Sequence, residues 1–254
     1  MNNNDCLIGY TGFIGQKLLS QKKFKFLFNS KNIDKIKNKK FNYVFCAGAP
    51  GVKWIANKYP KKDLVSINVL KKNIENIKCK KFILISTVDV YSNPINKSEK
   101  NKPIASKKNF YGKNRLGLEK FVMNNFDNFL IIRLTALVGK HLKKNILYDI
   151  KNKFQLDKIN KNSVYQYYPI DNLLKDIKKL SNENNKVIHL NSEPIKVDEI
   201  LHDNHLNLLN GSIIKKKELY NLKSIYSKKY MNIKSYFYSK KKILFYIKKY
   251  LHDN

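Results

Sequence analysis

The chain carries the stretch Gly9-Tyr10-Thr11-Gly12-Phe13-Ile14-Gly15 directly after a short apolar run, Cys6-Leu7-Ile8. Helical spacing begins within the stretch and continues beyond it. Three glycines between a strand and a helix suit a dinucleotide pyrophosphate: they permit a tight turn, a close approach of the backbone to the phosphates, and close packing of the helix on the strand. The alternative is a tight turn that binds nothing. The residues expected to line a dinucleotide site are Gly9, Thr11, Gly12, Phe13, Ile14 and Gly15.

Short apolar runs alternate with helical patterns along the chain, which is typical of a parallel sheet covered by helices on both faces. The expected strands are Cys6–Ile8, Phe24–Phe28, Tyr43–Cys46, Phe82–Ser86, Phe129–Leu134 and Val187–Leu190. The expected helices are Ile14–Ser20, Asp63–Ile77, Arg115–Asn124, Asp171–Leu180 and Val197–Leu208, with an abbreviated helix or turn around Asn32–Ile36. The pattern predicts an α/β fold with a doubly wound, Rossmann-like parallel sheet.

The charge of the chain is strongly positive, with 51 basic and 19 acidic residues and a net charge of +32. Such a charge can bind nucleic acid or an anionic membrane surface, or it can reflect a compositional bias toward lysine. The lysines are dispersed, and the only arginines are Arg115 and Arg133. Because base readout most often uses the arginine fork, we expect no specific nucleic-acid partner. The charge would still attract anionic substrates.

The three cysteines, Cys6, Cys46 and Cys79, each lie in or beside an apolar run, and their number is odd. This pattern indicates reduced, buried thiols and a cytoplasmic protein. Residues 1–5 do not have the pattern of a secretory leader, and no apolar run reaches the ~18 residues of a membrane span. The basic amphipathic stretch at residues 240–251 can lie on a membrane, but we expect it to pack on its own domain.

Two further motifs carry polar side chains. Ser86-Thr87 ends an apolar run and is followed by Val90-Tyr91, and later the chain reads Tyr111-Gly112-Lys113-Asn114-Arg115. With the glycine stretch, these motifs resemble those of the extended short-chain dehydrogenase/reductase family, also called the NAD-dependent epimerase/dehydratase family. The resemblance covers about residues 5 to 200 and includes later landmarks at Ile132-Arg133-Leu134 through Gly139, Ile170-Asp171-Asn172, and His189-Leu190-Asn191 through Glu199.

The resemblance implies that Thr87, Tyr111 and Arg115 form the catalytic group. Hydride transfer at a sugar carbon requires a proton to move at the same carbinol oxygen, and a tyrosine can move it if its pKa is drawn toward neutrality. A cation at i+4 lies on the same helix face and stabilises the phenolate, while the Thr87 hydroxyl can hold the substrate oxygen. Arg115 stands where the family usually has lysine. It keeps the charge and can bond the ribose hydroxyls, but it cannot give up a proton.

The segment after the second expected strand bears on the choice of cofactor. NAD-preferring sites place an acid there for the ribose 2′-hydroxyl. This chain has Asn29, Ser30 and Lys31 instead, which suit a 2′-phosphate, so NADP is favoured over NAD. Further residues expected at the cofactor are Ala47, Gly48, Ala49 and Ser86, together with Arg115. The histidine pair His202-x-x-His205 lacks further ligands nearby, so we expect no metal site.

The implied function is that of an NAD(P)-dependent oxidoreductase or epimerase acting on a nucleotide-linked sugar. Valine stands at position 88, where the dehydratases of the family have an acid, which argues against a 4,6-dehydratase. Asp89, Lys144 and Asn145 are candidate substrate contacts. Because of Arg115, a non-catalytic NAD(P)-binding sensor or scaffold is the main alternative, and nucleic-acid binding ranks below it. Relatives in the family often dimerise, so a homodimer is compatible with the resemblance.

We expect one compact unit with a reduced substrate lobe at its C-terminal side. Its dinucleotide-binding core would take residues 1–140 and be completed by about 163–191, with about 141–162 and 192–254 forming the substrate lobe and the C-terminal helix.

Overall fold

The computed structural model describes residues 4–203 and 217–253. Its contacts divide the chain into two compact units. The first unit consists of Met1–Ser92, Lys102–Arg133 and Leu173–Ile188, and the second of Asn93–Asn101, Leu134–Asn172 and His189–Asn254. The two units are described separately here. The sequence-based division into a core and a lobe within one compact unit stays a prediction.

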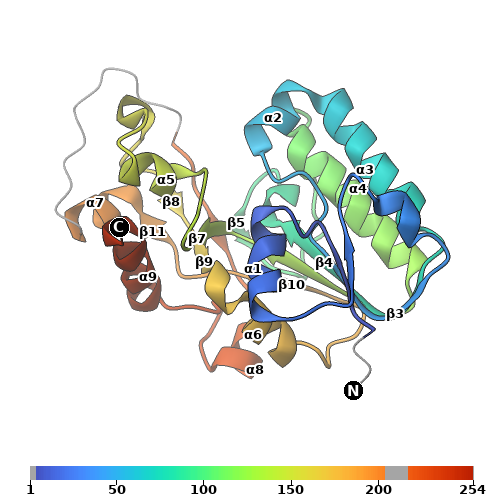
Figure 1. The fold of residues 1–254 in the computed structure, drawn as a ribbon. Coiled ribbons are helices and arrows are strands. Elements are labelled where there is room, and N and C mark those ends of the chain that lie inside the picture. Colours follow the sequence, from blue (N-terminus) through green and yellow to red (C-terminus); the bar gives the residue numbers. More distant parts are fainter. Residues whose placement is uncertain (1–3, 204–216, 254) are drawn as a thin grey trace. The chain divides into compact units, whose positions relative to one another are not determined.

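The first unit is built on the six-stranded sheet, in the order β10-β6-β4-β3-β1-β2 (Figure 1). Its strands are β1 (Cys6–Ile8), β2 (Phe26–Phe28), β3 (Lys40–Cys46), β4 (Lys78–Thr87), β6 (Phe129–Leu134) and β10 (Lys186–Leu190). β1 pairs in parallel with β2 and β3, and β3 pairs in parallel with β4. The chain leaves β1 for β2 on one side and then crosses to β3 on the other, so the carboxyl ends of β1 and β3 flank a topological switch point. The predicted Rossmann-like fold class is confirmed.

Helices cover both faces of this sheet. They are α1 (Phe13–Gln21), α2 (Lys53–Lys58), α3 (Pro60–Ile74), α4 (Phe110–Asn125) and α6 (Leu173–Lys179), with 3-10 turns η1 (Ile33–Ile36) and η2 (Val88–Val90). Helices α3 and α4 lie side by side, and α1 contacts α6 (Figure 1). Two helices begin three or more residues earlier than predicted, because Pro60 occupies the first turn of α3 and the Asn109 side chain caps α4. The six residues of α2 were not predicted, since so short a helix shows no periodicity.

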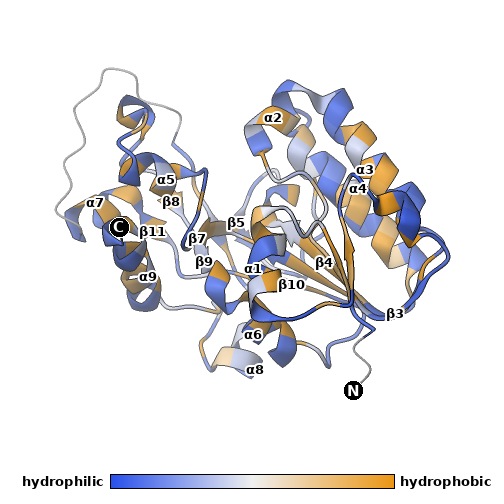
Figure 2. Cartoon of the chain, in the orientation of Figure 1, coloured by the Kyte–Doolittle hydropathy of each residue, from blue (hydrophilic) through white to orange (hydrophobic). Residues whose placement is uncertain are grey.

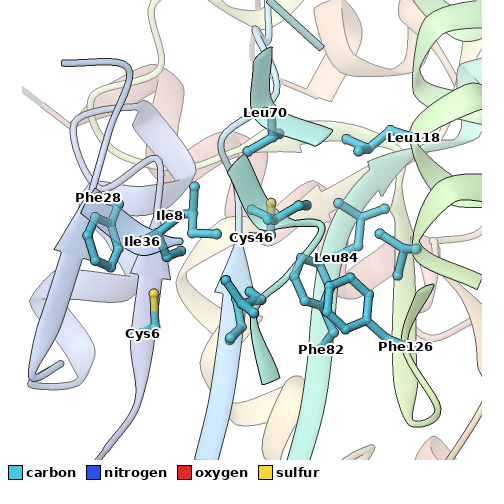
Figure 3. Packing of buried hydrophobic residues seen from close by; sticks show 14 of the residues in the cluster. Cys6, Ile8, Phe28, Ile36, Cys46, Leu70, Phe82, Leu84, Leu118 and Phe126 are labelled. Carbon is cyan, nitrogen blue, oxygen red and sulfur yellow. The ribbon is translucent and has the colours of Figure 1, made fainter. Parts of the chain in front are cut away.

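One core cluster of the first unit lies between the apolar strands of the sheet and the helices α3 and α4 (Figures 2 and 3). The Phe82 and Phe126 rings stack with centroids 4.2 Å apart. The expected reduced cysteines lie here, and burial raises the pKa of Cys46 to about 11 and that of Cys79 to about 12. Thiols with such pKa values are packing groups and not nucleophiles.

The second unit combines short two-stranded pairings with helices. β7 (Ala136–Val138) pairs in parallel with β9 (Tyr167–Pro169), and β8 (Val164–Tyr165) pairs antiparallel with β11 (Ile195–Lys196). The remaining elements include β5 (Ile95–Lys97), α5 (Ile146–Lys151), α7 (Val197–Asp203), β12 (Asn221–Leu222), α8 (Ser227–Met231) and α9 (Lys240–His252). The predicted helix Val197–Leu208 is seen as far as Asp203, and its residues 204–208 lie outside the described part of the chain.

The basic amphipathic helix α9 packs on its own unit, as expected. It buries Ile243, Ile247 and Tyr250 and contacts α5, α7 and β9. Across the described residues, no helix combines the length and the apolar character needed to cross a membrane.

Gly15 gives the first testable prediction. A Cβ placed there would overlap the Gly9 carbonyl oxygen, whereas a Cβ at Gly12 would meet only that oxygen at 3.4 Å. We expect Gly15→Ala to lower the free energy of unfolding by roughly 3 kcal/mol, because the helix must move off the strand. Gly12→Ala is the matched control and should cost about 1 kcal/mol or less. Urea denaturation of both variants measures the difference. Equal costs would contradict the close approach of α1 to β1.

Candidate active site

The glycine turn joins β1 to α1, and its three glycines serve different purposes. Gly9 has a φ of +85°, its N–H donates to the Phe28 carbonyl at 2.7 Å, and a Cβ on it would lie 2.5 Å from the Ala47 oxygen. Gly9 and Gly15 are therefore required by the fold. Gly12 has ordinary extended backbone, precedes the first turn of α1 and places no side-chain cap on it. The space beside Gly12 is open, so a ligand can approach the backbone N–H groups of this helix end.

The loop after β3 closes on the same turn. The Ala47 N–H donates to the Ile8 carbonyl at 2.9 Å, and a Cβ on Gly48 would lie 2.9 Å from the Ile8 side chain. The structure thus brings Ala47 and Gly48 against the carboxyl end of β1. Ala49, the third residue expected here, is half-buried beside the core.

The segment after β2 forms a tight polar turn. The Asn29 N–H donates to Asn32 Oδ1 at 2.7 Å, and the Lys31 N–H donates to Asn29 Oδ1 at 2.9 Å. The two asparagine side chains therefore shape the turn, while Ser30 and Lys31 are exposed at its tip.

Thr87 and Tyr111, expected to work together, are neighbours. Thr87 ends β4, and its Oγ1 accepts the Asp89 N–H at 3.1 Å, which fixes the start of η2. Tyr111 lies in the first turn of α4, and the Thr87 hydroxyl is near enough to lower the pKa of its phenol. The turn of α4 that carries Tyr111 is held against η2, because Asn109 Nδ2 donates to the Asp89 carbonyl at 3.0 Å and a Cβ on Gly112 would overlap the same oxygen.

Arg115 lies one turn after Tyr111 and stacks on its ring, with the guanidinium carbon 4.0 Å from the ring centroid. The guanidinium is 3% exposed and is held by Asp63 of α3, with 2.5 Å between Nη1 and Oδ2, and by the Pro50 carbonyl. Asn114 Nδ2 also donates to Asp63 Oδ2, at 2.7 Å. Within the described residues, Asp63 Oδ1 and Arg115 Nε are buried and have no hydrogen-bond partner. Arg115 thus contacts the face of Tyr111 and takes part in a buried ion pair.

The electrostatics of Tyr111 differ from the simple sequence-based picture. Burial is the largest influence and raises the pKa of the phenol. Arg115 lowers this pKa, as expected, and so do Lys53 and the Thr87 hydroxyl, whereas Asp89 raises it. The cation at i+4 therefore does not by itself bring the tyrosine toward neutrality, because desolvation of the phenolate outweighs it.

Ser86, expected near the cofactor, is hydrogen-bonded to a second buried ion pair. Its hydroxyl donates to Glu119 Oε1 at 2.5 Å, and Glu119 receives the Arg133 guanidinium on both carboxylate oxygens at 2.6–3.2 Å. Arg133 also donates to the Tyr91 hydroxyl at 2.9 Å. Both arginines of this lysine-rich chain are therefore buried, paired with a carboxylate and placed over a tyrosine ring.

Sequence reasoning missed two groups beside Tyr111, both on α2. Lys53 Nζ lies 2.6 Å from Asp89 Oδ1, and Asn57 Oδ1 accepts the Tyr111 N–H at 2.9 Å. It also missed Asp63 and Glu119 as ion-pair partners. A signal for Asp63 was present, since it falls on the buried stripe of α3 with Ile67, Leu70 and Ile74. A carboxylate on an apolar stripe requires a buried partner.

The remaining candidates lie in the second unit. Lys144 is exposed. Asn145 caps α5, with Oδ1 accepting the Leu147 and Tyr148 N–H groups at 2.9 and 3.3 Å, and its Nδ2 donates to the Leu137 carbonyl at 2.8 Å. Over residues 4–203 and 217–253, no three or more His, Cys, Asp or Glu side chains gather in a way that could hold a metal. His205 lies outside that range.

No family model and no curated protein matches the sequence of this chain. Solved structures match its fold over nearly its whole length. UDP-glucose 4-epimerase from Thermotoga maritima is 15% identical with a TM-score of 0.73, covering 98% of this chain and 97% of the enzyme. dTDP-4-dehydrorhamnose reductase from Bacillus anthracis, solved with NADP, is 14% identical with a TM-score of 0.75 and 98% of each chain covered. UDP-N-acetylglucosamine 4-epimerase from Methanobrevibacter ruminantium is 14% identical with a TM-score of 0.73, covering 98% of this chain and 97% of the enzyme.

These neighbours are two nucleotide-sugar 4-epimerases and a dTDP-4-dehydrorhamnose reductase, and at an identity of about one residue in seven they show a shared fold and no more. The resemblance drawn from the glycine stretch and the tyrosine motif is thereby confirmed at that level. The chain has the fold of the extended short-chain dehydrogenase/reductase family.

Proposed function

We propose that this chain is an NAD(P)-dependent oxidoreductase or epimerase that acts on a nucleotide-linked sugar. The observation that carries the proposal is that the first turn of α4, with Tyr111, is held against the segment after Thr87, beside the carboxyl edge of the sheet that also carries the glycine turn. Ile8 of β1 is in register with Cys46 of β3, and Cys46 with Leu84 of β4, so the two features are separated by a single strand. Dinucleotides bind at this edge of open α/β sheets.

The residues of the turn fit a dinucleotide. Gly12 leaves open the approach to the N-terminal turn of α1, and that turn receives no side-chain cap. The diphosphate would lie there, held by backbone N–H groups. When bound, the nicotinamide supplies or accepts the hydride. The chain's own part is to hold the substrate's carbinol or carbonyl oxygen at Thr87 and to move its proton at the Tyr111 phenol oxygen.

The cofactor we favour is NADP, with NAD as the alternative. Ser30 and Lys31 are exposed at the tip of the turn after β2, where a hydroxyl and a cation suit a 2′-phosphate. No carboxylate stands in this turn to hold a ribose 2′-hydroxyl. The asparagines on either side would act indirectly, by shaping the turn.

The proposed substrate class is supported by the charge of the chain and by the ligands of the solved structures that share its fold. Solved neighbours are described as complexes with UDP-glucose, UDP-glucuronic acid and UDP-N-acetylmuramic acid. An anionic nucleotide sugar also suits a protein with a net charge of +32. Asp89 would meet the sugar near Thr87, and Lys144 and Asn145 stay proposed substrate contacts. Val88 cannot act as a general acid, so a 4,6-dehydratase reaction is not proposed.

A second candidate function is non-catalytic binding of NAD(P), as in a sensor or scaffold. It is favoured by one observation: Nη1 and Nη2 of Arg115 bond to Asp63 and to the Pro50 carbonyl, and Arg115 cannot relay a proton as a lysine does.

Tyr111→Phe separates these two functions. In the enzyme, the variant loses the proton donor and should lower turnover by two orders of magnitude or more, with about the same affinity for NADPH. Hydride exchange with a panel of nucleotide sugars and calorimetric titration of NADPH measure the two quantities. Unchanged turnover would refute Tyr111 as the acid/base. Tight NADPH binding without hydride exchange in the wild-type protein would support the sensor.

We also propose that the chain forms a homodimer through α3. Leu64, Val65 and Val69 are 43%, 61% and 46% exposed, and no charged residue lies between Asp63 and Lys71 on this lysine-rich chain. An uncharged apolar face lets two strongly positive copies approach each other. Val69→Lys should convert the dimer to a monomer in light-scattering measurements. Ile104→Lys, which changes an exposed apolar residue elsewhere, should leave the dimer intact. A wild-type monomer would refute the proposal.

A further inference from the structure

Helix α2 holds the candidate active site through two side chains one helical turn apart. Asn57 fixes the backbone of Tyr111 by accepting its N–H at 2.9 Å. Lys53, on the same face of α2 at i−4, is ion-paired with Asp89 at 2.6 Å, and Asp89 follows Thr87 by two residues. Since Asp89 and Asn57 both contact the segments that carry Thr87 and Tyr111, the Lys53 ammonium group is held at the edge of the catalytic pair.

Lys53 differs from Arg115 in the properties that matter for a tyrosine acid/base. The Arg115 guanidinium is buried, spreads its charge over three nitrogens, and is shared with Asp63 and the Pro50 carbonyl. The Lys53 side chain is 45% exposed, carries its charge on one nitrogen, and can exchange a proton with solvent. The two cations are therefore held differently: Arg115 lies against the face of the Tyr111 ring, and Lys53 is ion-paired with Asp89 beside it.

We propose that Lys53, supplied from α2, replaces the lysine that the Tyr111-x-x-x-Arg115 motif lacks, and that its ammonium group, positioned by Asp89, stabilises the Tyr111 phenolate. This inference rests on the proposed role of Tyr111 in proton transfer. When Tyr111 gives its proton to the substrate oxygen, a negative charge forms on the phenol oxygen. Lys53 offsets that charge, and the phenolate later recovers a proton from solvent.

The charged and titratable groups that face Tyr111 come from every element packed on it. They are Lys53 on α2, Arg115 on α4, Asp89 on η2 and Asp63 on α3, the last through its pair with Arg115. Lys53 and Arg115 lower the pKa of the Tyr111 phenol, and Asp89 raises it. Removal of Lys53 also leaves Asp89 without the cation at 2.6 Å, so the phenolate loses an attraction and gains a repulsion. Both changes raise the pKa.

The test is a direct titration of Tyr111 in the full chain without cofactor or substrate. The protein is labelled with 3-fluorotyrosine, because fluorine on the ring lowers the phenol pKa and brings the titration into a range where the protein is folded. Tyr111→Phe identifies the Tyr111 resonance in the fluorine NMR spectrum. Lys53→Met is compared with Lys58→Met, which removes the same charge from an exposed position on the same helix.

We expect Lys53→Met to raise the titration midpoint of Tyr111 by about one pH unit, a tenfold loss of phenolate at any lower pH. Lys58→Met should shift it by no more than about 0.2 unit, since the Lys58 charge is exposed to screening by solvent and is not among the charges that shift the pKa of Tyr111. Lys53→Arg should retain most of the wild-type value. A midpoint that is the same in wild type and Lys53→Met, or a Tyr111 that does not titrate at all in the folded wild-type protein, would overturn the proposal.

The same variants have a second readout in turnover. If the proposed function holds, Lys53→Met moves the limb of the pH–rate profile that Tyr111 sets to higher pH, which is the alkaline limb when Tyr111 donates its proton to the substrate. A purely structural role would lower turnover equally at every pH. Failure of the proposed function would show as an absence of turnover in the wild-type protein. Failure of this inference would show in the NMR titration, which needs neither cofactor nor substrate.

Discussion

The close approach of α1 to the end of β1 is the constraint on which the first unit depends. Gly15 rests on the Gly9 carbonyl, and Gly9 in turn rests on the Ala47 carbonyl. These two contacts set the helix, the end of β1 and the loop after β3 in one arrangement that any Cβ would disturb. Gly12 takes no part in this packing, and the backbone beside it is open. The proposed ligand site is therefore a turn whose other two glycines are needed for packing.

Two buried ion pairs extend this arrangement to the candidate catalytic residues. Arg115–Asp63 joins α4 to α3, and Arg133–Glu119 joins β6 to α4 and to Ser86 of β4. Burying a lone charge is costly, so each carboxylate and its arginine must stay paired as the unit folds. An arginine, with its several donors in one plane, can satisfy a carboxylate and a further acceptor together, which a lysine ammonium does with less precision. This gives a physical reason for arginine at two positions of a lysine-rich chain.

The sequence was sufficient to predict a parallel sheet, because each strand is an apolar run. The parallel direction of the strands follows from the helices between these runs. The glycine turn was predicted from its own residues, whereas the approach of Thr87 to Tyr111 was expected only from the family resemblance. The sequence could not predict Lys53 or Asn57, because α2 is too short for periodicity and its contacts with Asp89 and Tyr111 are distant in sequence. The raised pKa of Tyr111 could not be predicted from the sequence either, since burial is a property of the fold.

The most direct test of the account is a calorimetric titration of NADPH and NADH into the wild-type protein, Gly12→Asp and Gly12→Asn. The position before α1 has the extended backbone in which Asp and Asn both cap a helix, so neither variant should lower the melting temperature. The account predicts wild-type binding with NADPH preferred, loss of binding in Gly12→Asp, whose carboxylate repels the diphosphate, and weaker binding in Gly12→Asn. A wild-type protein that binds neither cofactor, or a Gly12→Asp variant that binds as tightly as wild type, would contradict it.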